Sequence, residues 1–417
     1  MTTTLLALAV VVAAAQVGGA VATRLRQPRV IGELLAGLIL GPSAVGAVAP
    51  GYLELLFPDE VVVRLEFVAE LGLVLFVTLV GVEFDRAQLR GQGRRAVVVS
   101  LVSIVVPFAL GLTVAGWIGR TTGEAVDPAA YAVFLGAAMA VTAFPVLVRI
   151  LESLGISRAP LGTLVIACAG VDDVVAWVLL AISVAVATSG APGEVVATVV
   201  LAAGFAAVVL GVLRPALARL PRVPLPLVVL LSLGGAWATD RIGVSVVFGA
   251  FLVGLAVPRG ETAAHVERML APFTTTVLLP AFFVVVGLAT RVGSIDSVDL
   301  WIVTLLVVVI ASVGKFGGAA VAARATGSTW ADALAIGSLM NARGLTEVVV
   351  LTIGLELAVI GPTTFTIMVL MAVITTVAAG PLARRFLGSG NGPDPSSSAG
   401  SVGPSGSDGL IPPTGDR

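Results

Sequence analysis

The sequence predicts an all-helical protein that crosses a membrane many times, and three observations indicate this fold class. Hydrophobic residues make up 58% of the 417 residues and charged residues only 12%, whereas about 25% charged residues is usual in soluble domains. Apolar runs of roughly 20 residues, the length that crosses a bilayer, recur along the chain. The basic residues gather in alternate loops between these runs.

Thirteen apolar runs are expected to cross the membrane. The second, eighth and ninth are short, with Pro or Gly at their edges, and only Asp240 and Arg241 separate the eighth run from the ninth. The predicted spans are 4–23, 28–42, 61–83, 96–117, 129–150, 161–188, 194–213, 225–239, 243–258, 272–289, 299–323, 330–355 and 362–383.

The arginines predict how these spans are oriented. Most loop arginines follow odd-numbered spans, and Arg64, Arg120, Arg241 and Arg291 are the exceptions. Because loops rich in Lys and Arg remain on the cytoplasmic side, we expect the N-terminus outside and the C-terminus in the cytoplasm. The sequence thus predicts a multi-pass protein of the cell (plasma) membrane.

We expect two regions, a transmembrane domain over residues 1–387 and a cytoplasmic tail over residues 388–417. The tail is rich in Gly, Pro, Ser and Asp, and such a composition predicts disorder because it buries little apolar surface. The single cysteine, Cys168, excludes an internal disulfide, and the single histidine, His265, excludes a His-based zinc site. The sequence has no basic patch of the kind that binds nucleic acid, so nucleic-acid binding is not expected. No cofactor is expected either.

Two predicted spans contain residues that interrupt helices. Thr142-Ala143-Phe144-Pro145 lies in the fifth span and Asn341-Ala342-Arg343-Gly344 in the twelfth. Pro145 lacks an N–H and disturbs the carbonyl of Val141, and Gly344 permits an unwound backbone. The two spans are seven apart and cross in opposite directions, as in an inverted repeat of spans 1–6 against spans 8–13. Paired broken helices indicate a transport site, although Pro and Gly can also merely kink a membrane helix.

Three charged residues lie near the middle of predicted spans: Asp172 and Asp173 in the sixth and Lys315, the sole lysine, in the eleventh. A charge at this depth costs at least about 2.5–3.5 kcal/mol, so such residues are expected either to form ion pairs or to bind a transported ion. Adjacent side chains on a helix point about 100° apart. We hypothesise that one aspartate pairs with Lys315 and that the other faces a water-filled cavity, where it exchanges a proton for a hard cation such as Na⁺ or K⁺.

The alternative for these three residues is a structural ion pair that only orders the bundle, but that alternative leaves the second aspartate unexplained. Arg343 and Glu347 lie four residues apart beside the second break. We interpret them as a structural pair that holds the unwound segment.

Eight motifs, in order from about residue 27 to residue 382, resemble those of the monovalent cation:proton antiporters. The nearest branch holds Kef-type transporters and plant cation/proton exchangers. The motifs are QPRVIGELLAGLILGP at 27–42, LG through GVE at 71–83, TAFPVLVRIL at 142–151, GVDDVVAW at 170–177, GAFLVGLAVP at 249–258, LLPAFFVVVGL at 278–288, Lys315, and NARGLTE at 341–347.

The resemblance implies the sodium/proton antiporter fold, a homodimer and an elevator-like movement that gives alternating access. Core helices are then expected at about 61–188 and 272–383. Dimerisation helices are expected at about 1–42 and 194–258.

The resemblance also implies roles for individual residues. Asp173 matches the aspartate that binds cation or proton in turn, and Asp172 matches the variable position before it, where an Asp pairs with a lysine matching Lys315 and goes with electrogenic exchange. Thr142 and the backbone around Ala143 match the segment that helps to ligate the cation. Plant relatives carry Asn at the position of Asp172 and Kef-type proteins carry Gln, so the choice between Na⁺ and K⁺ stays open.

The sequence therefore predicts a secondary transporter, not an enzyme, that exchanges Na⁺ or K⁺ for protons. An inverted-repeat organic anion/Na⁺ symporter of the bile-acid type is the alternative that shares this architecture. An intramembrane aspartyl protease needs two carboxylates facing each other across one proton, whereas both aspartates here are neighbours on one span. A purely structural or sensor role predicts that Asp173→Ala leaves all ion fluxes unchanged.

Overall fold

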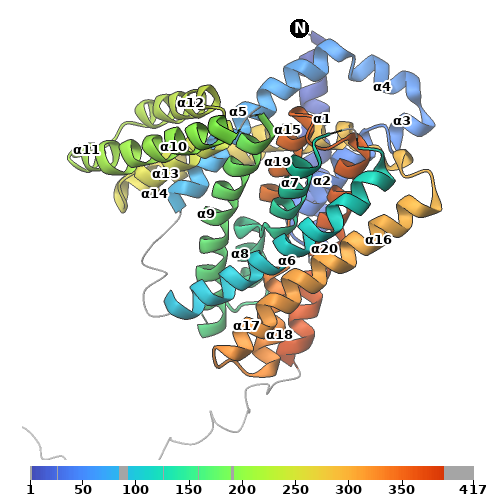
Figure 1. Cartoon of the computed structure of the whole chain (residues 1–417). Coiled ribbons are helices and arrows are strands. Elements are labelled where there is room, and N and C mark those ends of the chain that lie inside the picture. Colours follow the sequence, from blue (N-terminus) through green and yellow to red (C-terminus); the bar gives the residue numbers. More distant parts are fainter. Residues whose placement is uncertain are drawn as a thin grey trace, which may run out of the picture.

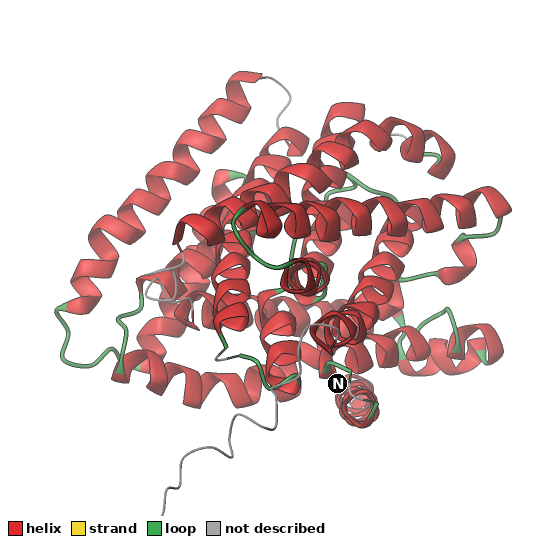
Figure 2. Ribbon diagram, turned by 90° about the horizontal axis from the view of Figure 1, so that it is seen from below, coloured by secondary structure: helices red, strands yellow, loops and turns green. Residues whose placement is uncertain are grey.

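The computed structural model describes residues 2–25, 27–83, 93–124, 126–157, 159–188 and 192–388. Throughout these residues every regular element is a helix, as the sequence predicts, and the helices form one bundle (Figures 1 and 2). The last helix ends at Gly388, and the rest of the predicted tail, residues 389–417, lies outside the described residues. The N-terminus and the connection between α17 and α18 lie at opposite ends of the molecule in Figure 1.

The elements follow one another in this order. The first half of the chain forms α1 (Thr2–Arg24), α2 (Arg29–Leu40), α3 (Val45–Val48), α4 (Pro50–Leu56), α5 (Asp59–Glu83), α6 (Gly93–Thr122), α7 (Pro128–Ala140), α8 (Phe144–Ser153) and α9 (Pro160–Thr188). The second half forms α10 (Pro192–Val208), α11 (Arg214–Ala218), α12 (Leu225–Ile242), α13 (Val246–Ala256), α14 (Glu261–Phe273), α15 (Leu279–Ala289), α16 (Val298–Ser312), α17 (Gly318–Ala325), α18 (Trp330–Met340), α19 (Leu345–Glu356) and α20 (Pro362–Gly388). The turns η2 (Val209–Leu213), η3 (Thr274–Leu278) and η5 (Val313–Gly317) are π-helical, and η4 (Val292–Ser294) is a 3₁₀ turn.

Each predicted span contains helix, but the number of thirteen stays a prediction. Ten helices in the described part of the chain are long and apolar enough to cross a membrane, and three shorter apolar helices cover Pro128–Ala140, Val246–Ala256 and Trp330–Met340. The short helices α3 and α4, between the second and third predicted spans, were not predicted.

The predicted boundary between the eighth and ninth spans is wrong. α12 continues through Asp240 and Arg241 to Ile242 and is followed by the capping residue Gly243, whose φ is 87°. This left-handed conformation favours glycine as the residue that ends a helix. Ser245 then caps α13 by accepting a hydrogen bond from the N–H of Val247 at 3.4 Å.

The helices pack in two groups that alternate along the chain. In the first group, which we call the panel (α1, α2, α5 and α12–α15), α5 lies against α13 and α15, and α2 lies against α1 and α15. In the second, the core bundle (α6–α9 and α16–α20), α6 lies against α7, α9 and α17, and α20 lies against α16 and α18. Small residues allow close crossings inside membranes. A Cβ on Gly81 of α5, for example, would lie 2.5 Å from the carbonyl oxygen of Phe251 in α13.

Both predicted interruptions are confirmed. Residues 141–143 separate α7 from α8, and residues 341–344 separate α18 from α19. Pro145 lies in the first turn of α8, where its missing N–H costs little. Gly344 has a φ of 156°, which L residues rarely adopt, and a Cβ there would lie 2.9 Å from the side chain of Val146. The two unwound segments therefore meet inside the core bundle.

Candidate functional site

α9 carries both aspartates past the point where the two unwound segments meet. Asp172 is 1% exposed, Asp173 is 2% exposed and Lys315 is fully buried. α9 is an uninterrupted apolar helix of 29 residues that begins at Pro160, and Pro favours the first position of a helix. The structure thus brings the predicted charged residues of two distant spans together in the interior of the core bundle.

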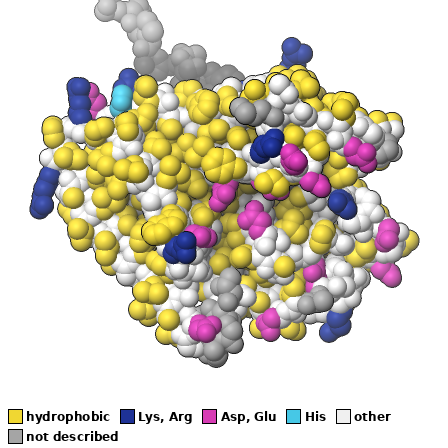
Figure 3. Space-filling view, turned by 90° about the horizontal axis from the view of Figure 1, so that it is seen from above, with side chains coloured by type: hydrophobic (Ala, Val, Ile, Leu, Met, Phe, Trp, Pro, Cys, Tyr) yellow, Lys and Arg dark blue, Asp and Glu magenta, His cyan; other side chains and the backbone are white. Residues whose placement is uncertain are grey.

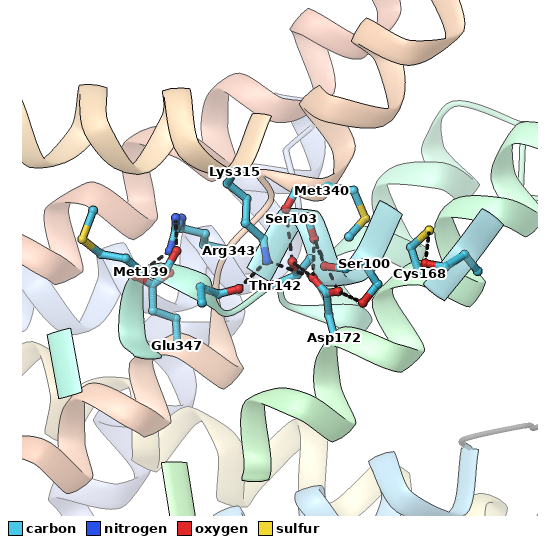
Figure 4. Close-up of polar contacts among 12 residues, drawn as sticks. Ser100, Ser103, Met139, Thr142, Cys168, Asp172, Lys315, Met340, Arg343 and Glu347 are labelled. Atoms are coloured by element: carbon cyan, nitrogen blue, oxygen red, sulfur yellow. Dashed lines mark hydrogen bonds and ion pairs between the residues drawn. The ribbon is translucent and has the colours of Figure 1, made fainter. Parts of the chain in front are cut away.

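Asp172 accepts hydrogen bonds from several side chains (Figure 4). Its Oδ2 accepts from Lys315 Nζ at 2.9 Å and from the hydroxyl of Thr142 at 2.7 Å. Its Oδ1 accepts from the hydroxyl of Ser100 on α6. The hydroxyl of Ser103, one turn further along α6, lies 3.3 Å from Oδ2 and 3.5 Å from Oδ1. The predicted pair of Asp172 with Lys315 is confirmed, and hydroxyl donors from α6 and from the unwound segment between α7 and α8 surround it.

Lys315 lies in the π-helical turn η5, a type of turn that is frequent at functional sites. Besides Asp172, its Nζ donates to the carbonyl oxygen of Ala140, the last residue of α7. The carbonyl groups at the end of a helix carry partial negative charge and attract cations. Lys315 therefore neutralises both a carboxylate and the end of the first broken helix.

Arg343 occupies a matching place in the second unwound segment. Its Nη1 lies 3.3 Å from Glu347 Oε1, which confirms the predicted pair, and both side chains are fully buried. The guanidinium also donates to the carbonyl oxygens of Ala138 at 3.3 Å and Met139 at 2.8 Å. Together, Arg343 and Lys315 occupy the last three carbonyl groups of α7.

Asp173 has a different environment from Asp172. The carboxylate interacts with the backbone N–H of Phe144, the first residue of α8. Its Oδ1 is buried and accepts no hydrogen bond from the described residues. A buried carboxylate oxygen without a partner is costly, so Asp173 is the aspartate with capacity for a ligand.

The first unwound segment also offers oxygen atoms. Neither the carbonyl of Val141 nor that of Thr142 accepts a backbone hydrogen bond within the described ranges. Both backbone polar groups of Ala143 form hydrogen bonds: its N–H donates to the carbonyl of Ala342 at 3.2 Å, and its own carbonyl accepts from the N–H of Leu147 at 3.0 Å. The oxygens nearest to Phe144 that remain available are therefore those of Val141 and Thr142.

Sequence reasoning missed the side chains that support this centre. Ser100 and Ser103 are three residues apart in a mostly apolar span, and that spacing could have indicated one polar helix face. Thr376 of α20 accepts a hydrogen bond from the N–H of Arg343 at 2.9 Å and lies 2.7 Å from the Arg343 carbonyl oxygen. Nothing in the local sequence distinguishes Thr376 from its neighbour Thr375.

Other arrangements of acidic residues are not found in the described part of the chain. Its buried aspartates are Asp172 and Asp173, both on α9, so a pair on two facing helices, as proteolysis would need, is not formed there. Nor do three or more His, Cys, Asp or Glu side chains gather there in a way that could hold a metal ion.

The sequence of the chain matches a known protein family. The model of the family "Sodium/hydrogen exchanger, transmembrane" matches residues 8–387. The Na⁺/H⁺ antiporter NhaS4 of Synechocystis is 38% identical over 396 residues, which cover 90% of this chain and 95% of that protein. Cation/H⁺ antiporter 20 of Arabidopsis thaliana is 39% identical over 86% of this chain. The K⁺/H⁺ antiporter 1 of Saccharomyces cerevisiae is 34% identical over 86% of this chain.

The chain spans nearly all of the cyanobacterial relative but only 45% of the plant protein and 43% of the yeast protein. Among solved structures, the sodium proton antiporter MjNhaP1 of Methanocaldococcus jannaschii is similar with a TM-score of 0.63 at 16% identity, over 93% of this chain and 97% of that one. This likeness shows the fold. On the family match and these relatives, the chain is a multi-pass membrane protein that belongs to the sodium/hydrogen exchanger family.

Proposed function

We propose that this protein exchanges a monovalent cation, Na⁺ or K⁺, for protons across the cell membrane, and that Asp173 is the residue that carries them. The observation that supports this role best is the contrast between the two aspartates. Asp172 is held by Lys315 and hydroxyl groups, whereas Asp173 Oδ1 accepts no hydrogen bond from the described residues. The names of the relatives, which include Na⁺/H⁺ and K⁺/H⁺ antiporters, point to the same activity.

The chemistry is a competition for one carboxylate. A proton bound to Asp173 removes the cost of its buried charge, and a bound monovalent cation does the same, so each displaces the other. Carboxylate and carbonyl oxygens suit hard cations. The carbonyls of Val141 and Thr142 would complete the coordination, while Asp172 and the Thr142 hydroxyl would shape the site from the other side. Ala143 would act through its position in the backbone.

Exchange requires that Asp173 meet the two sides of the membrane in turn. We propose that the core bundle moves against the panel as a unit, in the manner of an elevator, and that the panel forms a homodimer. The movement of the core bundle as a unit is supported by its composition. It contains all the parts of the candidate site, namely α9, η5 and both unwound segments. This division departs from the expected one, which places residues 61–83 and 272–289 among the core helices, because α5 packs against α13 and α15 packs against α2.

Acidic side chains favour a cationic substrate. Seen from the top of Figure 1, one face of the molecule carries Asp and Glu side chains around its centre, with a few basic side chains beside them (Figure 3). Glu66 and Glu70 of α5 interact electrostatically with Glu356 at the end of α19. Carboxylates that lie close together raise the local concentration of cations.

The proposal is tested with the purified chain in liposomes that contain a pH-sensitive dye. Addition of Na⁺, K⁺ or Li⁺ outside acid-loaded liposomes should cause proton efflux, and choline should not. The order of the three rates identifies the preferred ion. An organic anion/Na⁺ symporter would instead show Na⁺-dependent uptake of a labelled bile acid without proton efflux, and that result would overturn the proposal. Glycosylation tags at each end of the chain would test the N-terminus-outside orientation.

A further inference from the structure

Trp177 lies one turn past Asp173 on α9. Residues four apart on a helix lie on the same face, about 6 Å apart along the axis. A long side chain on a helix leans toward the N-terminus and covers the preceding turn. The indole ring of Trp177, which is 2% exposed, is therefore the first large side chain that follows Asp173 on its own face of α9.

The ring also joins the core bundle to the panel. Its centroid lies 6.0 Å from that of Phe251 on α13, and the two ring planes are inclined by 40°. Phe251 is likewise 2% exposed, and an aromatic pair adds stability beyond the apolar area that it buries. Further along α9, Leu180 and Val184 are 1% and 4% exposed. Beyond Asp173, the Trp177 face of α9 is thus buried in apolar contacts.

The polar atom of the indole ring lacks a partner in the described part of the chain. Trp177 Nε1 is buried and donates no hydrogen bond there. Buried indole N–H groups usually have an acceptor, because an unsatisfied donor has lost the hydrogen bond that it makes with water. A loss of this size changes the equilibrium between two conformations by a factor of about 5 to 150. An apolar ring of the same shape would make the contact with Phe251 without this cost.

The ring and its N–H therefore act in opposite directions on a movement that separates α9 from α13. The ring favours contact between the two helices, since separation exposes apolar surface to water. The N–H favours separation, since water then supplies its acceptor. Apolar contacts of this kind close ion pathways because they exclude water.

We propose that Trp177 is a positioning residue that closes one side of Asp173 by packing against Phe251, and that its indole N–H sets how readily this side opens. The proposal rests on the proposed exchange and on the movement of the core bundle against the panel. Trp177 acts through the contact between these two groups of helices and does not bind the ion. With the orientation that the arginines predict, α9 ends outside, so Trp177 closes the outer side.

An isostere separates the role of the ring from that of its N–H. 3-Benzothienylalanine, introduced at position 177 by nonsense suppression, keeps the shape of the fused rings and has sulfur in place of the N–H. Opening is measured in a protein with Cys168→Ala and Ala181→Cys, because Ala181 lies one turn beyond Trp177 and is 8% exposed. The readout is the rate at which a charged methanethiosulfonate modifies the introduced thiol in the detergent-solubilised full chain.

The isostere at position 177 should slow this modification by a factor of about 5 to 150, because the closed state no longer contains an unsatisfied donor. Trp177→Ala and Phe251→Ala should accelerate it, because each removes one ring of the pair. The same isostere in place of Trp301 on α16, which is 49% exposed, is the matched control and should leave the rate unaltered. Equal rates in the parent protein and in the isostere at position 177 would overturn the proposal.

Exchange in liposomes that hold the protein in one orientation supplies the second readout. The isostere at position 177 should raise the KM for the cation on the side toward which α9 ends and not on the opposite side, because a smaller fraction of the protein is open there. A loss of exchange with an unaltered rate of thiol modification would show that the N–H acts on Asp173 instead, and would overturn the proposed role. Absence of cation-dependent proton flux in the parent protein would refute the exchange activity, whereas the thiol measurement tests the Trp177 contact by itself.

Discussion

The backbone N–H of Ala143 donates to the carbonyl oxygen of Ala342 across 3.2 Å and thereby joins the two unwound segments directly. Beside this contact, the hydroxyl of Thr142 lies 3.2 Å from the carbonyl oxygen of Met340, the last residue of α18. The backbone groups that each break exposes are therefore partly satisfied by the other break. This arrangement accounts for two interrupted helices in a membrane interior, where an unsatisfied backbone group costs several kcal/mol.

Asp173→Asn should abolish cation-dependent proton flux in liposomes, because the amide can neither bind a proton in this range of pH nor offer a charged ligand to a cation. The same change should leave the unfolding temperature unaltered or raise it, since it removes a buried carboxylate whose Oδ1 accepts no hydrogen bond from the described residues. Both quantities are measured on one purified preparation. Exchange that persists in a folded Asp173→Asn protein would refute the role of this residue.

Lys315→Ala should destabilise the protein by about 3–5 kcal/mol, because it leaves the buried carboxylate of Asp172 without its cation. It should also shift the pH optimum of exchange. The control is the double variant Asp172→Asn with Lys315→Met, which removes both charges and should recover much of the lost stability. An unaltered unfolding temperature together with an unaltered pH profile in Lys315→Ala would count against the pair.

Arg343 and Glu347 should show strong coupling in a double-mutant cycle. Arg343→Met is expected to cost about 3–5 kcal/mol, since Glu347 loses its cation and two carbonyls of α7 lose a donor. Glu347→Leu combined with Arg343→Met should cost less than the sum of the single changes, by about 0.5–3 kcal/mol. Denaturant titration in detergent measures all four proteins. Strictly additive costs would show that the two side chains do not depend on each other.

Thr376→Val should destabilise the second unwound segment by about 1–3 kcal/mol, because the N–H of Arg343 loses its acceptor inside the protein. Thr375→Val is the matched control. Among the described residues, the hydroxyl of Thr375 donates to carbonyls of its own helix, at Met371 and Ala372, so its loss should cost less. The comparison uses unfolding temperature and the KM for the cation, and equal effects of the two changes would contradict the role of Thr376.

Local features account for what could be predicted. The spans, the breaks near Pro145 and Gly344, and the buried charges of α9 and η5 all follow from short-range rules: apolar length, helix-breaking residues and the cost of a charge in lipid. The boundary at Asp240 failed for a related reason. Charged residues mark a loop only on average, whereas Gly243 ends α12 through its left-handed conformation.

The amino-acid sequence by itself determined that this protein lies in a membrane, where its helices break, and that two aspartates and one lysine share its interior. The charge pattern left open which aspartate pairs with Lys315, and the family resemblance implied Asp172. Only the tertiary structure showed that pair and showed that Asp173 Oδ1 accepts no hydrogen bond in the described part of the chain. The two side chains are adjacent in sequence and point in directions about 100° apart around the axis of α9. Their roles therefore depend on which residues pack against each of these two directions. Those neighbours, Ser100, Thr142 and Lys315, come from elements that only packing brings together.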